Sequence, residues 1–149
     1  MTLETFFYEF IDETFCDFKR RPKTVRAFKT LCERVPDSDI DELPSITVIA
    51  PHPRTPAFCT YGTKAEAIIY LDYSLEKKPQ TEVDFSVAHE FAHALKGHFR
   101  KENMVLTPEQ VKAGYLNWNV EVEADELAAT WGYTIPKRRK RKIRKGRPA

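Results

Sequence analysis

Apolar side chains recur every three to four residues in the first part of the chain, and this spacing predicts two amphipathic helices. The first set is Leu3, Phe6, Phe7, Phe10, Phe15 and Phe18, and the second, after Pro22, is Val25, Phe28, Leu31, Cys32 and Val35. The chain is therefore expected to open with two helices.

β-Branched residues in the middle of the chain predict three short strands. Residues 46–50 (ITVIA) have the composition of a buried strand, and residues 58–62 (FCTYG) and 67–73 (AIIYLDY) suggest a hairpin around Gly62. Three prolines between residues 51 and 57 remove the backbone donors that a continuous strand needs. N-terminal helices followed by a small mixed sheet of about three strands predict an α+β fold.

A third helix is predicted between Thr81 and Gly97. Thr81 followed by Asp84 resembles a capping box, and Gly97 is expected to end the helix. At 100° per residue, His89 and His93 lie together on a side of the helix that points away from its apolar stripe. That stripe consists of Val83, Val87, Phe91 and Leu95.

The same helix carries the pattern His-Glu-x-x-His from His89 to His93. The four-residue spacing brings both imidazoles to one face, where each can reach one zinc ion at roughly 2 Å. Glu90 lies about 100° from His89, where a carboxylate can flank a metal and take a proton from its water. The plainer interpretation is a pair of surface or core histidines without a metal.

A glutamate-bearing helix over residues 119–133 is expected to supply the third ligand that zinc requires. Glu121 and Asp125 lie together on the flank of its core stripe, whereas Glu123 and Glu126 fall on the other side and are interpreted as surface charge. Glu121 is therefore the predicted third ligand, and Asp125 is expected to accept the second ring N–H of a ligand histidine. The alternative is a charged helix whose acids are all solvated.

His98 competes with Glu121 as the third ligand. In metal-dependent peptidases with a third histidine, that residue follows the second ligand by six positions, whereas His98 follows His93 by five. His98 is therefore interpreted as a residue near the mouth of the site, which either donates to an oxyanion or simply lies at the surface. Tyr115 is a second candidate for an oxyanion or substrate contact.

Three segments together resemble the ImmA/IrrE-type zinc metallopeptidases: AIIYLDYS (67–74), VDFSVAHEFAHALKGH (83–98) and EVEADELAA (121–129). The resemblance covers about residues 44 to 133 and implies a zincin-like metallopeptidase domain with Zn²⁺ as cofactor. It also implies His89, His93 and Glu121 as ligands, and Glu90 as the catalytic base. The implied activity is hydrolysis of peptide bonds, in a DNA-associated repressor or another regulatory protein. Ala92 stands where the family often has Gly, and WGYTIPKRR (131–139) replaces its usual ending.

Charge divides the chain into an acidic body and a basic tail. Nine of the 24 basic residues and none of the 22 acidic ones lie in residues 137–149. The body therefore holds 15 basic and 22 acidic residues, a charge of about −7, although the whole chain has a net charge of +2. We expect a single domain over residues 1–136 and a disordered tail that neutralises nucleic-acid phosphates, with solubilising or targeting roles as alternatives. The basic residues are Lys137, Arg138, Arg139, Lys140, Arg141, Lys142, Arg144, Lys145 and Arg147.

Three cysteines are too few and too widely spaced for a disulfide framework, and no apolar run approaches the ~18 residues of a membrane span. Both observations favour a cytoplasmic protein without a membrane partner. The resemblance to metallopeptidases implies a protein or peptide as substrate. Two other functions fit the sequence. One is a DNA-associated protease similar to SprT or WLM domains, acting on protein–DNA crosslinks, and the other is a zinc-bearing binding module without hydrolysis.

Overall fold

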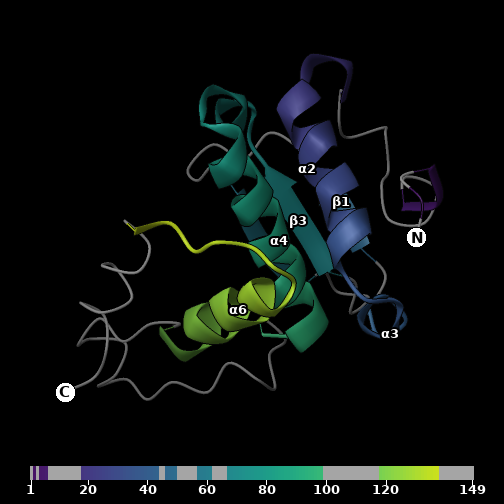
Figure 1. Cartoon of the computed structure of the whole chain (residues 1–149), viewed down its shortest axis with the longest axis vertical. Coiled ribbons are helices and arrows are strands. Elements are labelled where there is room, and N and C mark those ends of the chain that lie inside the picture. Colours follow the sequence, from purple (N-terminus) through teal and green to yellow (C-terminus); the bar gives the residue numbers. More distant parts are fainter. Residues whose placement is uncertain are drawn as a thin grey trace.

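A computed structural model of the chain describes residues 2, 4–6, 18–43, 46–49, 57–61, 67–98 and 118–137 (Figure 1). The helices are η2 (Phe18–Arg20), α2 (Pro22–Arg34), α3 (Asp37–Ile40), η3 (Tyr73–Lys77), α4 (Gln80–Lys96) and α6 (Trp118–Thr130). The strands are β1 (Ile46–Ile49), β2 (Ala57–Tyr61) and β3 (Ala67–Leu71). Most of the predicted first helix, over residues 3–18, lies outside the described residues.

The three strands form a mixed sheet in the order β1-β3-β2. β1 runs parallel to β3, with Val48 opposite Ile69, and β2 runs antiparallel to β3, with Cys59 opposite the same residue. β3 is therefore the central strand, and within the described part of the chain β1 and β2 each have one neighbour.

The expected α+β fold class needs correction, because the described part of the chain is predominantly helical. α2, α4 and α6 contain 13, 17 and 13 residues, whereas each strand contains four or five. Among the buried hydrophobic side chains that the structure describes, only Ile69 and Leu71 come from strands. Packing between helices thus builds most of the described core. The α+β prediction overestimated the share of the core that the short strands supply.

The N-terminus of α2 is capped by a residue that lies far away in the sequence. Pro22 occupies the first turn, where its missing N–H costs no hydrogen bond, but Arg21 at the N-cap makes no side-chain cap. The carboxylate of Glu76 in η3 accepts the backbone N–H groups of Lys23 at 3.0 Å and Thr24 at 2.9 Å. It also accepts the Thr24 hydroxyl at 2.8 Å, so η3 is fixed against the start of α2.

The sequence predicted the C-terminal end of α4 correctly but not the cap at its N-terminus. The capping box predicted at Thr81 is wrong, because the helix begins at Gln80 without a side-chain cap, and Asp84 instead accepts from the Gln80 amide at 2.8 Å. The predicted stop at Gly97 is confirmed, with φ at 65°. The following backbone N–H, that of His98, donates to the His93 carbonyl at 3.3 Å.

α4 is buried around most of its circumference rather than along one stripe. It lies between α2 and α6, with α6 crossing its C-terminal half, and it also packs against β2 and β3 (Figure 1). His89 is 7% exposed and His93 is 1% exposed. Both histidines are buried because α6 covers the side of α4 on which they lie.

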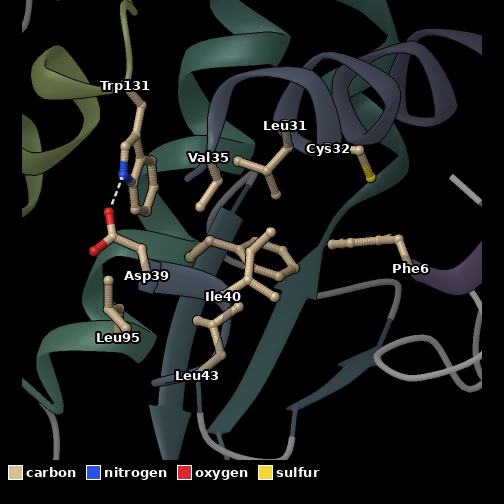
Figure 2. A pocket seen from close by; sticks show the side chains of 10 residues that line it. Phe6, Leu31, Cys32, Val35, Asp39, Ile40, Leu43, Leu95 and Trp131 are labelled. Carbon is tan, nitrogen blue, oxygen red and sulfur yellow. Dashed lines mark hydrogen bonds between the residues drawn. The ribbon is translucent and has the colours of Figure 1, made fainter. Parts of the chain in front are cut away.

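A small apolar hollow, partly open to solvent, lies between α2, α3, α4 and α6 (Figure 2). The rings of Phe6 and Phe91 lie 5.4 Å apart, and the indole N–H of Trp131 donates to Asp39 at 2.8 Å. The Cys32 thiol lines the hollow, and burial raises its pKa to about 11, so it stays protonated at neutral pH.

Among the described helices, none combines the length and the apolar character that crossing a membrane requires.

Candidate metal centre

The three predicted ligands converge on one point between α4 and α6. The Nε2 atoms of His89 and His93 lie 2.9 Å apart. The Glu121 carboxylate places Oε2 at 3.0 Å from His89 Nε2 and Oε1 at 3.4 Å from His93 Nε2. One donor atom from each residue lies within 4.8 Å of the others, so these three residues could hold a metal ion.

Asp125 contacts the His89 ring at Nδ1, the nitrogen opposite the one that faces the ligand cluster. His89 Nδ1 lies 2.7 Å from Asp125 Oδ1, and Asp125 is 1% exposed. A carboxylate accepts hydrogen bonds and cannot donate them, so the proton of this pair belongs to the His89 ring. In the neutral imidazole, Nε2 then carries a lone pair that points at the ligand cluster.

His98 is buried behind His93, and this corrects the expectation that it lies near the mouth of the site or at the surface. Its exposed fraction is 4%, its Nδ1 lies 2.9 Å from His93 Nδ1, and its Nε2 lies 2.7 Å from Glu123 Oε2. The left-handed turn at Gly97 reverses the chain and brings His98 back under His93. Both ring nitrogens of His98 thus face partners inside the protein rather than a substrate.

Glu123 makes a contact in the site that the sequence pattern missed. Its side chain is 54% exposed, which agrees with the interpretation as surface charge, but its carboxylate also accepts from the buried ring of His98. Burial is the larger influence on His98 and lowers the pKa of its ring, with Glu123 acting in the opposite direction. A histidine directly after a helix-ending glycine is the signal that could have revealed this contact.

Glu90, the predicted catalytic base, is a buried residue of α4. It directly follows His89 on α4 and is 7% exposed. Burial of an ionised carboxylate is costly, so a glutamate at such a position is more often tied to function than one on the surface. The ring of Phe85 packs one turn before His89, with 5.8 Å between the ring centroids, and forms an apolar wall.

The spacing of the donor atoms fits a small divalent cation. Ligand atoms about 2.0–2.1 Å from a tetrahedral zinc ion lie about 3.3 Å from one another. The corresponding separations here are 2.9, 3.0 and 3.4 Å.

Two groups of predicted residues are not tested by these contacts. Tyr115 and the basic residues after Lys137 lie outside the described residues, and Lys137 itself is exposed. Their predicted roles in substrate contact and nucleic-acid binding stay predictions.

Comparisons of the chain with protein-family models, with curated proteins and with solved structures found no match.

Proposed function

We propose that this chain is a zinc-dependent peptidase, with His89, His93 and Glu121 as ligands and Glu90 as the catalytic base. The observation that carries the proposal is the convergence of three buried or half-buried donor groups from two helices on one point. The resemblance of these segments to ImmA/IrrE-type peptidases supports the same function, with a DNA-associated regulatory protein as the proposed substrate class.

The donor set favours a catalytic zinc ion over a structural one. Structural zinc sites are closed by four protein ligands, usually including cysteine, whereas catalytic sites have three protein ligands and one position for water or substrate. The described residues bring two imidazoles and one carboxylate together and add no fourth protein ligand to this group. The site can therefore admit a substrate group.

The residues of the chain divide the proposed chemistry between them. A zinc ion at this point would act as a Lewis acid toward a peptide carbonyl and lower the pKa of water toward about 7. Glu90 takes one proton from the attacking water as its oxygen bonds to the carbonyl carbon, and passes that proton to the leaving nitrogen when the C–N bond breaks. Phe85 helps to exclude bulk water from beside His89.

An extended substrate would pair with β2. Peptides often bind by adding a strand to a free sheet edge. β3 pairs with a strand on each side and has no free edge. β2 packs against α4 and has one neighbour within the described residues, so it is the proposed docking strand.

The SprT- or WLM-like alternative is less well supported. Such domains usually complete the zinc site with a third histidine, but His98 contacts the Nδ1 of His93, on the far side of the ring from the donor cluster. Glu121 occupies the third position instead.

The experiment that tests the proposed function is a comparison of the native chain with Glu90→Gln. We expect the native chain to contain about one zinc ion and to cleave a labelled, unfolded protein substrate. Glu90→Gln should keep the zinc and lose at least about 100-fold in kcat, because general-base catalysis contributes about 10²–10⁴-fold. Glu126→Gln, a change at an exposed glutamate of α6, is the control and should keep full activity.

Two other results would count against the proposal. A native chain that binds zinc but cleaves nothing would be a zinc-bearing binding module. Undiminished cleavage by Glu90→Gln would remove Glu90 from the mechanism.

A further inference from the structure

A buried hydrogen-bonded chain runs from the surface of α6 to the back of the second ligand. Glu123 Oε2 lies 2.7 Å from His98 Nε2, and His98 Nδ1 lies 2.9 Å from His93 Nδ1. The opposite nitrogen of His93, Nε2, faces the ligand cluster. Three side chains thus form one continuous path that ends at the candidate metal position.

Glu123, at the exposed end of this path, determines where the protons lie along it. The carboxylate of Glu123 can only accept, so Nε2 of His98 carries a proton. A neutral imidazole with its proton on Nε2 presents Nδ1 as an acceptor, and Nδ1 of His98 lies 2.9 Å from Nδ1 of His93. His93 must therefore donate from Nδ1, which leaves a lone pair on Nε2.

We propose that Glu123 and His98 are positioning residues that fix the tautomer of His93, so that its Nε2 meets a divalent cation without a proton. This inference rests on the proposed metal site and extends it to two residues outside the ligand set. Partners behind a metal-bound histidine fix its ring and raise its basicity, and their loss typically weakens metal binding about 10- to 100-fold.

The path also explains why α6 matters beyond Glu121. Asp125 fixes the proton of His89, and Glu123 fixes that of His93 through His98. All three carboxylates belong to α6, and both ligand histidines belong to α4. The packing of one helix against the other therefore sets one ligand and both tautomers at once.

The discriminating variant is Glu123→Gln. The glutamine amide has nearly the same shape but can donate as well as accept, so it no longer obliges His98 to carry its proton on Nε2. We expect zinc affinity, measured by competition with a chromogenic chelator, to fall about 10-fold or more. His98→Phe keeps a planar ring but removes the acceptor for His93, and it should weaken binding at least as much.

Glu126→Gln is the matched control, because it makes the same change on the same helix at an exposed position. It should leave zinc affinity within about twofold of the native value, since exposed charges contribute little. An equal loss of affinity in Glu126→Gln and Glu123→Gln would show a general effect of charge and overturn the inference.

A second readout reports the tautomer without any metal. In the zinc-free native chain, the ¹⁵N and ¹H NMR correlations of His93 should show the proton on Nδ1, and Glu123→Gln should move a substantial fraction of it to Nε2. A native His93 that carries its proton on Nε2 would overturn the inference. If the native chain binds no zinc at all, the proposed function fails, and this spectrum still decides the positioning role on its own.

Discussion

At the scale of single residues, Gly97 connects the end of α4 to the chemistry of the site. Its φ of 65° lies in the left-handed region, where a residue with a Cβ is strained by about 1–2 kcal/mol. The turn that it makes brings His98 into contact with His93 at 2.9 Å. Backbone conformation at one position therefore determines whether the path behind the second ligand can form.

Gly97→Ala should lower the free energy of unfolding by about 1 kcal/mol and also weaken zinc binding, because the strained turn displaces His98. Denaturant unfolding and chelator competition measure the two effects. Gly132→Ala is the control, because Gly132 also has a positive φ, of 90°, with no heavy atom within 4 Å of an added Cβ. It should destabilise the chain to a similar degree but leave zinc affinity unchanged. Unaltered zinc affinity in Gly97→Ala would contradict this account.

Helical spacing anticipated some of these contacts and missed others. Positions 89, 93, 121 and 125 could be predicted to meet because each pair lies one turn apart on its helix. The contact between His98 and Glu123 could not, because it depends on the direction of the chain after Gly97 and on where α6 crosses α4. Tertiary packing, rather than local periodicity, determines both.

At the scale of elements, the most informative contact is the cap that η3 provides for α2. Glu76 satisfies two backbone donors at the positive end of the helix dipole, where a negative charge is stabilising. The same segment lies between β3 and α4, so the cap ties the sheet connection to the helix that packs beside α4.

Glu76→Gln should lower the free energy of unfolding by about 1–2 kcal/mol, because the amide replaces the charge and presents a donor to the N–H groups. Thermal or urea unfolding measures the change. Glu33→Gln, at an exposed position in the last turn of α2, should change stability by less than about 0.5 kcal/mol. A destabilisation of the control equal to that of Glu76→Gln would refute the capping role.

The positions of the helices could be predicted from the sequence better than the residues that cap them. Pro22 begins α2, and Gly97 directly follows the last residue of α4. Both boundaries can be predicted from the residue itself, without knowledge of its distant neighbours. The N-terminus of α4 has no side-chain cap although Thr81 suggested one, and α2 is capped by a residue 52 positions away from Thr24. Such long-range caps leave no trace in a local pattern.

At the scale of the whole molecule, charge is distributed so that the basic residues concentrate at one end. Residues 137–149 hold nine basic and no acidic residues, whereas the rest of the chain holds an excess of acids. Attraction to nucleic-acid phosphates would therefore come mainly from this segment and would be sequence-independent and sensitive to salt.

Deletion of residues 137–149 should reduce retention on double-stranded DNA strongly at low salt, because release of counterions drives such binding. Zinc content should be unchanged, since His89, His93 and Glu121 all lie outside the deleted segment. Equal retention of the truncated and full chains between about 50 and 200 mM salt would remove the nucleic-acid role of the tail.

The global arrangement was the part of the fold that the sequence revealed least. Apolar spacing predicted the helices and the short strands one by one, but not that α2, α4 and α6 together build most of the described core. Periodicity identifies which face of a helix is apolar, but α4 is covered on several sides, and this depends on neighbours that are distant in the sequence.

The most direct test of the central claim is an anomalous difference map at the zinc absorption edge, from crystals of the native chain prepared with zinc. We predict one strong peak about 2.0–2.2 Å from the Nε2 atoms of His89 and His93 and from a Glu121 carboxylate oxygen. The absence of a peak there, or a peak bound by His98 in place of Glu121, would contradict it.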